Sequence, residues 1–248
     1  MRYRATLAYD GTAYQGFQRQ AGDTRTIQLA LEQAIAVVTG QPVTVKGAGR
    51  TDTGVHASGQ VIAFDVEWKH ADDALLRAIN VTLPPDIAVL NICQQPGFSP
   101  RHNAFSRLYR YRVLVTPVRH PLVRQRMWQI ERALDGDLMQ QAAHLLIGEH
   151  DFGAFGQPPR GENTVRKLFQ SEWVNQQTEY GMQWTYTVEG TAFLLHMVRR
   201  MVWQMVQVGQ GRMMVSAFEE RFRKAKLVGI TSIAPPQGLT LELVRYNE

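Results

Sequence analysis

Apolar and polar residues alternate along much of the chain, which is the pattern of β-strands. Successive side chains of a strand point to opposite faces, so an alternating segment buries one face and exposes the other. Strands are predicted over residues 2–9, 43–46, 61–66, 87–92, 108–115, 165–174, 184–188 and 239–243. The segments 165–174 and 184–188 lie on either side of the turn residues Glu179-Tyr180-Gly181, so we expect them to pair.

A second periodicity, close to 3.6 residues, predicts helices between these strands. They are expected over residues 26–38, 71–83, 137–146, 192–208 and a final segment that begins near 216. Thr26 is the expected N-cap of the first helix and Gly40 its stop, whereas Asp137 is expected to cap the third. Residues 216–219, Ser-Ala-Phe-Glu, are expected to form a capping box. Strands with one or two covering helices predict an α+β chain with antiparallel or mixed sheets.

The segment 94–106 shows neither period and is expected to link two halves. The first half, residues 1–104, contains a conspicuous glycine-bounded loop around Asp52. The second half, residues 105–248, is basic and contains Tyr109, Arg199 and Leu239. A length of 248 residues accommodates one large domain or two smaller ones.

The positive charge is concentrated in the second half. Net charge is +5, yet residues 1–104 carry equal numbers of basic and acidic side chains. Between Arg101 and Ile130 there are seven arginines and no acid. Such a stripe is either a solvated face or the footprint of a polyanion, and arginine suits phosphate better than lysine does. Cys93 is the single cysteine and no apolar run is long enough to span a membrane, so we expect a cytoplasmic protein.

The loop Gly49-Arg50-Thr51-Asp52-Thr53-Gly54-Val55-His56-Ala57 is the strongest candidate for chemistry. Glycine permits a positive φ or a close backbone approach, and threonine hydroxyls stiffen turns. We expect a rigid loop that presents Asp52, with Arg50 near enough to keep it ionised. The alternative is a turn with an ordinary surface ion pair. The sequence contains no Walker A loop, no Rossmann glycine fingerprint, no nucleophile elbow and no clustered metal ligands.

Two further segments place polar side chains near expected buried faces. In the strand 108–115, Tyr109 and Tyr111 point to one face, and Arg110 and Arg112 to the other. In the helix 192–208, Arg199 lies at the border of the apolar stripe. Arg199 either extends along that border to solvent or reaches a site between the helix and a sheet.

These motifs resemble the bacterial tRNA pseudouridine synthase A family along essentially the whole chain. The matching residues are Tyr9-Asp10-Gly11-Thr12, Gly16-Phe17-Gln18-Arg19-Gln20, Gly49-Arg50-Thr51-Asp52, Gly54-Val55-His56-Ala57, Gln60-Val61, Arg107, Tyr109-Arg110-Tyr111, Asp151-Phe152, Phe193-Leu194, His196-Met197-Val198-Arg199 and Gly238-Leu239. The resemblance implies the pseudouridine synthase fold. It also implies conversion of uridine to pseudouridine at positions 38–40 of the tRNA anticodon stem-loop, by a homodimer without cofactor or metal.

The resemblance also implies roles for individual residues. Asp52 corresponds to the catalytic aspartate, Arg50 to its paired arginine and Arg199 to a second active-site arginine, with Tyr109 as the active-site tyrosine and Leu239 as a pocket residue. Substrate contacts are expected from Arg19, Arg101, Arg110 and Arg112. The target base must be flipped out of its stack before such chemistry. Asp52 would then either attack the ribose or remove its C2′ proton, and both routes remain open.

The chain departs from the family pattern in three places: Ser99-Pro100 replaces His-Ala, Arg200 replaces Asn, and Trp203 replaces Gly. The first two bear on tRNA contacts and the third on helix packing or the dimer surface. A different class of function is a non-catalytic RNA-binding protein that stacks bases on sheet aromatics. Such a module would have no use for Asp52.

Overall fold

The structure is a computed structural model, and it describes residues 1–22, 24–158, 161–227 and 232–247. Two compact units make up the chain: Met1–Phe105 with Thr240–Glu248, and Ser106–Leu239. The sequence prediction divided the chain at 104/105 and left residues 240–248 in the second half. In the structure the final strand groups with the first unit, because its backbone pairs with a strand there.

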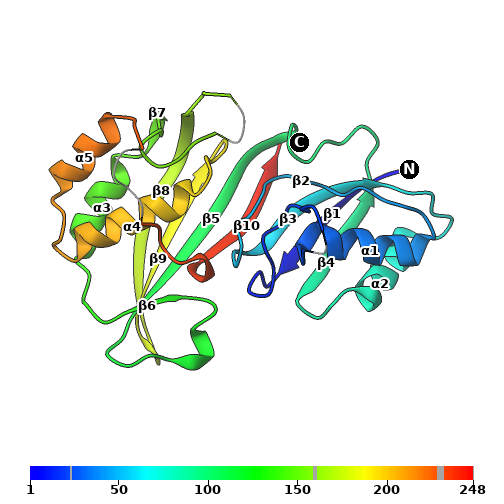
Figure 1. The fold of residues 1–248 in the computed structure, drawn as a ribbon, viewed down its shortest axis with the longest axis horizontal. Coiled ribbons are helices and arrows are strands. Elements are labelled where there is room, and N and C mark those ends of the chain that lie inside the picture. The colour runs from blue at the N-terminus through cyan, green and yellow to red at the C-terminus, as the bar shows by residue number, and fades with distance from the viewer. Residues whose placement is uncertain (23, 159–160, 228–231, 248) are drawn as a thin grey trace. The chain divides into compact units, whose positions relative to one another are not determined.

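The first unit is a mixed sheet with two helices. Its strands follow the order β4-β1-β3-β10, and β2 pairs with β3. The strands are β1 (Arg2–Tyr9), β2 (Lys46–Gly47), β3 (His56–Asp65), β4 (Ile87–Gln94) and β10 (Leu239–Tyr246). β1 is antiparallel to β3 and β4, whereas β10 runs parallel to β3. The helices α1 (Ile27–Thr39) and α2 (Asp72–Thr82) pack against each other (Figure 1).

The second unit is a largely antiparallel sheet with three helices. Its strands follow the order β5-β9-β8-β7, and β6 pairs with β5 in parallel. The strands are β5 (Ala104–Val115), β6 (Trp128–Ile130), β7 (Gly148–Asp151), β8 (Val165–Thr178) and β9 (Gly181–Gly190). The helices are α3 (Gly136–His144), α4 (Met197–Gly209) and α5 (Val215–Arg223), with short 3-10 turns η1 (Pro121–Val123) and η2 (Pro236–Gly238). Figure 1 shows α3, α4 and α5 gathered beside β8.

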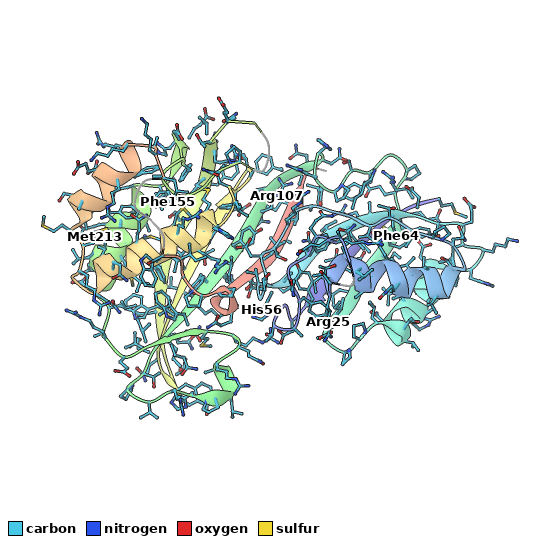
Figure 2. All side chains as sticks on the ribbon, in the orientation of Figure 1. Arg25, His56, Phe64, Arg107, Phe155 and Met213 are labelled. Atoms are coloured by element: carbon cyan, nitrogen blue, oxygen red, sulfur yellow. The ribbon has the colours of Figure 1, made fainter. Side chains whose placement is uncertain are left out.

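Each unit has its own apolar core. In the first unit, fully buried side chains come from the sheet and from the inner faces of α1 and α2, namely Tyr3, Leu7, Leu31, Ile35, Ile62, Phe64, Leu75 and Ile79. In the second they come from β5, β9, α4 and α5, namely Tyr111, Val113, Tyr186, Val188, Met201, Met205 and Phe218. Phe64 and Phe155 mark the two cores in Figure 2. The predicted α+β class is confirmed.

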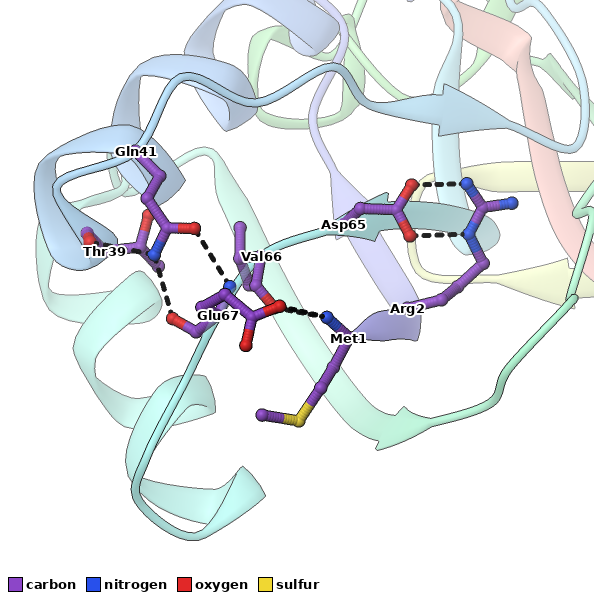
Figure 3. Close-up of polar contacts among 7 residues, drawn as sticks. All are labelled: Met1, Arg2, Thr39, Gln41, Asp65, Val66 and Glu67. Carbon is purple, nitrogen blue, oxygen red and sulfur yellow. Dashed lines mark hydrogen bonds and ion pairs between the residues drawn. The ribbon is translucent and has the colours of Figure 1, made fainter.

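The N-terminus fixes one end of β3. The Met1 ammonium donates to Val66 O at 2.9 Å and to Glu67 Oε1 at 3.1 Å (Figure 3). Arg2 forms a two-pronged ion pair with Asp65, and its hydrogen bonds hold the pKa of the Asp65 carboxyl below its usual value. The opposite end of β3 begins at His56, directly after the candidate loop.

Most predicted elements are confirmed, and four predictions differ from the structure in extent or in cap. The strand predicted over 43–46 is only β2, because side chains of α1 bind the backbone of Val45. The helix predicted from 192 begins at Met197, after His196 with φ 62°. The cap of α3 is Asp135 instead of Asp137. The capping box at 216–219 is wrong, since Ser216 lies inside α5.

Candidate active site

The loop that carries Asp52 is anchored by its neighbours on both sides. Thr51 is buried, and its Oγ1 lies 2.8 Å from the Tyr9 hydroxyl. Burial raises the pKa of Tyr9 to about 12, and either hydroxyl of this pair can donate the hydrogen bond. Thr51 O accepts from the Phe17 N–H at 3.0 Å, and Asp52 O accepts from the Val55 N–H at 3.1 Å. Asp52 therefore lies, half-buried, in a tight and well-bonded turn.

Glycines allow the segment 10–17 to lie directly against this loop. A Cβ on Gly11 would lie 2.0 Å from Val55 O, and one on Gly16 would lie 2.8 Å from Thr51 O. Gly16 and Gly54 also have positive φ values, 83° and 77°. Larger residues would force the two segments apart, so the glycines hold the backbone around Asp52 in place.

His56, the residue that follows the turn, contacts the segment 10–17 as well. It is almost fully buried, at the start of β3 (Figure 2). The Gly11 N–H donates to His56 Nδ1 at 3.1 Å, and Asp10 Oδ1 lies 3.1 Å from the same nitrogen. The expected rigidity of the loop thus comes from contacts to β1 and its following turn as well as from the loop itself.

Arg50 is held by a series of amide side chains that leads to α1. Arg50 Nε donates to Gln18 Oε1 at 3.2 Å, and Gln18 Nε2 donates to Gln28 Oε1 at 2.6 Å. Gln28 Nε2 then donates to Glu32 Oε1 at 2.8 Å. The predicted pairing of Arg50 with Asp52 stays a prediction, since the hydrogen bond described for the Arg50 side chain runs to Gln18.

Glu32 is the buried end of this series. Its carboxylate also accepts from the Val45 N–H at 3.0 Å and pairs with Arg19 Nη1 at 3.0 Å. Only 7% of the Glu32 side chain is exposed, against 57% of Arg19. A buried carboxylate is tolerated when it is paired and hydrogen-bonded, and this one is. Arg19, a predicted substrate contact, is thereby fixed at one end.

A second group of predicted residues lies in the other unit. Tyr109 is buried on β5 opposite Val188, with its ring edge-on to Phe193 at a centroid distance of 5.1 Å. Arg199 is also buried, and its Nε donates to Ala234 O at 2.8 Å. Of the two alternatives for Arg199, extension to solvent is therefore excluded.

The segment that leads to Leu239 is tied to β5 and α4. The Ala234 N–H donates back to Arg199 O at 3.1 Å, and the Tyr111 hydroxyl donates to Pro235 O at 2.7 Å. A Cβ on Gly238 would lie 2.6 Å from the Tyr111 ring, so glycine is needed there. Burial raises the pKa of Tyr111 well above its usual value, although the charge of Arg199 opposes this. Tyr111 is a core residue, and it positions the approach to the buried Leu239.

The expected substrate arginines differ in exposure. Arg101 and Arg110 are exposed and Arg112 is half-buried, so all three present some surface to solvent. Arg107, in contrast, is buried and donates through Nη1 to Thr191 O at 2.8 Å (Figure 2). The alternation in the strand could have identified this, because Arg107 has the same parity as Tyr109 and Tyr111. Arg107 is a structural cation and not part of the exposed stripe.

The three departures from the family pattern have structural partners in this chain. Trp203 on α4 stacks on Trp128, with centroids 5.6 Å apart and planes 13° apart. Arg200 Nη1 donates to Phe155 O and Leu195 O at 3.1 and 2.9 Å. Pro100 O accepts from the Tyr246 hydroxyl at 2.9 Å.

Sequence reasoning missed Gln18, Gln28 and Glu32 as a supporting network. A signal was present, because Gln28 and Glu32 are four residues apart on the face of α1 that also buries Leu31 and Ile35. Polar side chains on a buried helix face need partners. Across the described ranges, 1–22, 24–158, 161–227 and 232–247, no three His, Cys, Asp or Glu side chains are grouped to hold a metal. The described helices are all too short or too polar to cross a membrane.

A family model described as tRNA pseudouridine synthase matches residues 5–101 and 142–247. A tRNA pseudouridine synthase A of Neisseria gonorrhoeae is 38% identical over 247 residues, which cover 99% of this chain and 92% of that relative. Relatives of the same name from Methylacidiphilum infernorum and Myxococcus xanthus are each 39% identical over 249 residues. The matches cover 98% and 100% of this chain, and 95% and 92% of those relatives.

Proposed function

The chain belongs to the tRNA pseudouridine synthase family, and we propose that it isomerises uridine to pseudouridine in tRNA. The observation that carries this proposal is the match along nearly the whole chain, which includes the loop of Asp52. The finer target, positions 38–40 of the anticodon stem-loop, rests on the motif resemblance. The proposed roles of single residues rest on that resemblance together with the surroundings described above.

The reaction breaks the bond between uracil N1 and ribose C1′, turns the base and joins C1′ to C5. The proton on C5 leaves and N1 gains one, so atoms and electrons balance without a co-reactant. Asp52 is the proposed catalytic group, either as nucleophile on the ribose or as base toward the C2′ proton. Both roles need a carboxylate in a fixed place, and the bonded turn around Asp52 supports that requirement.

We propose that the detached base and its sugar are held and protected by Tyr109, Arg199 and Leu239. Tyr109 would stack on uracil and assist removal of the C5 proton through its phenol. Arg199 would supply fixed positive charge from a buried position, and Leu239 would keep water from the sugar. The shared anchoring of Arg199 and the Leu239 segment at Ala234 supports a concerted placement of these two groups.

The partner is tRNA, proposed to contact Arg19, Arg101, Arg110 and Arg112 through its phosphates. Arg19 keeps further N–H groups of its guanidinium for such a contact while Nη1 pairs with Glu32. We also propose that the protein is a homodimer, lies in the cytoplasm and needs neither cofactor nor metal. All three of these proposals rest on the resemblance.

Replacement of Asp52 by Asn tests the proposed function. The amide keeps the shape but can neither attack the sugar nor accept a proton as a carboxylate does. We expect release of tritium from C5-labelled uridine in tRNA to be abolished, while tRNA affinity and thermal unfolding stay near those of the unmodified protein. The matched control is Asp73→Asn, the same change at an exposed position of α2, which should keep full turnover.

Two outcomes would contradict the proposal. Turnover of Asp52→Asn within about tenfold of the unmodified protein, which is ~1.4 kcal/mol of barrier, would exclude Asp52 as the essential group. No tritium release from the unmodified protein, with tRNA binding intact, would favour the non-catalytic RNA-binding alternative.

A further inference from the structure

A loop of the second unit, residues 116–127, is closed at its base. It leaves β5 and returns as β6, whose residues Trp128 and Ile130 pair with Val113 and Val115. The Thr116 N–H donates to Ile130 O at 2.9 Å across the base. A loop whose ends are joined in this way is a compact unit, and such loops are frequently functional.

Side chains fix the interior of this loop. Gln129 Oε1 accepts from the His120 N–H and Gln129 Nε2 donates to His120 O, both at 2.7 Å. Trp128 is held by its stack on Trp203 and by the edge of Tyr111, at a centroid distance of 6.4 Å. The loop therefore presents its remaining side chains from a well-supported frame.

The loop lines most of a hollow of about 540 Å³. Its apolar wall is formed by Pro121, Met127 and Trp128. Its polar groups come from Arg119, Arg124 and Gln237. This volume is in the range of small-molecule sites. The loop lies outside the residues that the family model matches, 5–101 and 142–247.

The charged side chains that line the hollow are arginines. Arg119 and Arg124 are exposed, and the sequence has no acid between Arg101 and Ile130. Within the described part of the chain, neither guanidinium has an ion pair or a side-chain hydrogen bond. Arg2 and Arg25 in the first unit, by comparison, each pair with an aspartate. Two unpaired guanidinium forks at one hollow match the geometry of a phosphate.

We infer that this hollow binds a backbone phosphate of the RNA substrate, at a place separate from the residues proposed for catalysis. The inference rests on the proposed function for the identity of the RNA. Gln237 lies two residues before Leu239, at most ~7 Å along the chain. The phosphate is therefore expected close to the target nucleotide in the RNA sequence, and the site should act on a stem-loop fragment as well as on whole tRNA.

The test is the double variant Arg119→Gln with Arg124→Gln. Its matched control is Arg212→Gln with Arg221→Gln, which removes the same charge from exposed positions elsewhere in that unit. Affinity for a stem-loop RNA that contains the target uridine is measured by fluorescence anisotropy at several salt concentrations. We expect the site variant to bind about tenfold or more weakly, with the salt slope reduced by about 0.7–0.9 for each phosphate that is no longer neutralised. The control should leave both the affinity and kcat nearly unchanged.

Several results would overturn the inference. Equal losses of affinity in site variant and control would mean that only net charge matters. If the site variant kept its RNA affinity but no longer bound inorganic phosphate, the hollow would be assigned to a free anion. Unchanged RNA affinity with an altered sedimentation coefficient would assign it to an interface between two copies of the chain. Because affinity is measured without turnover, failure of the proposed isomerase activity would appear separately, as absent tritium release from the unmodified protein.

Discussion

At the scale of residues, the placement of Arg50 depends on a carboxylate that lies two side chains away. Glu32 accepts hydrogen bonds from Gln28 and from the backbone of Val45, and Gln18 carries the connection on to Arg50. The Glu32 carboxylate therefore accepts hydrogen bonds both from its own helix, through Gln28, and from a separate segment, through Val45. Its effect on the loop of Asp52 is indirect and depends on Gln18, the one exposed member between the core and Arg50.

Replacement of Gln18 by Ala should therefore impair turnover without harming the fold. Loss of an exposed amide changes the free energy of unfolding by no more than about 0.5 kcal/mol. Arg50, however, loses the hydrogen bond from its Nε to Gln18 Oε1. We expect kcat to fall about tenfold, the size of one modest transition-state contact, with KM nearly constant. Gln20→Ala is the control, because Gln20 is an exposed amide of the same segment whose side chain donates to Gln15 O at 3.0 Å.

A double-mutant cycle identifies the route of the effect. If Gln18 acts through Arg50, the losses for Gln18→Ala and Arg50→Ala should not add. Losses that multiply fully would show that Gln18 acts elsewhere.

The sequence singled out Asp52, Tyr109 and Arg199 as candidates because motif and periodicity are local. It did not identify the network of Glu32, because the partners Arg19 and Val45 lie 13 residues away on either side. A buried polar side chain destabilises the fold when it lacks hydrogen-bond partners and stabilises it when it has them. Those partners can be distant in sequence, and only the fold brings them near.

At the scale of elements, β3 and β10 lie in close contact at Gly59. A Cβ there would lie 2.1 Å from Glu242 O and 3.1 Å from Leu243 Cα, both backbone atoms. Ser58, the neighbouring residue, adds a hydrogen bond from Oγ to Glu242 Oε2 at 2.7 Å. A clash with backbone cannot be relieved by rotation of a side chain, so the strands themselves would have to separate.

Gly59→Ala should consequently destabilise the first unit. We expect a loss of about 1–3 kcal/mol in the free energy of unfolding by urea, the usual cost of overpacking. The control, Ser58→Ala, removes one exposed hydrogen bond and should cost no more than about 1 kcal/mol. Equal stability of Gly59→Ala and the unmodified protein would mean that β10 does not need this close approach.

Element type was predictable wherever periodicity was strong, as in β1 and the β8–β9 pair. Boundaries failed where distant groups compete for the backbone. The apolar run at 192–195 continues the helical pattern of α4, yet the Leu195 N–H donates to Gln157 O and His196 adopts a positive φ. A partner almost forty residues upstream leaves no trace in local periodicity.

At the scale of the whole molecule, affinity for tRNA should fall steeply with salt. The first 104 residues are neutral overall, so the excess charge acts from the rest of the chain. Each phosphate neutralised contributes about 0.7–0.9 to the slope of log affinity against log salt. Arg110→Gln should lower the slope by about that amount, because Arg110 is exposed. Filter binding over a tenfold salt range provides the measurement, and a slope near zero would contradict the basic-surface interpretation.

The α+β class and the family could be predicted from sequence because both depend on many positions along the chain. Membership of the units could not be predicted fully, since it depends on one pairing between remote segments. Ser58 and Glu242 are 184 residues apart, and chain order alone places them in different halves.

The position of β10 sets the order in which the protein can be completed during synthesis. Chains grow at ~5–20 residues per second, so the ribosome needs on the order of ten seconds to travel from Phe105 to Thr240. Throughout that interval β3, which follows the Asp52 loop, lacks its parallel neighbour, and by its end the second unit has its whole sequence. A chain released at that moment would therefore contain every proposed catalytic side chain and still present an open strand edge next to the Asp52 loop. The parallel pairing of β3 then depends on translation of the residues of β10.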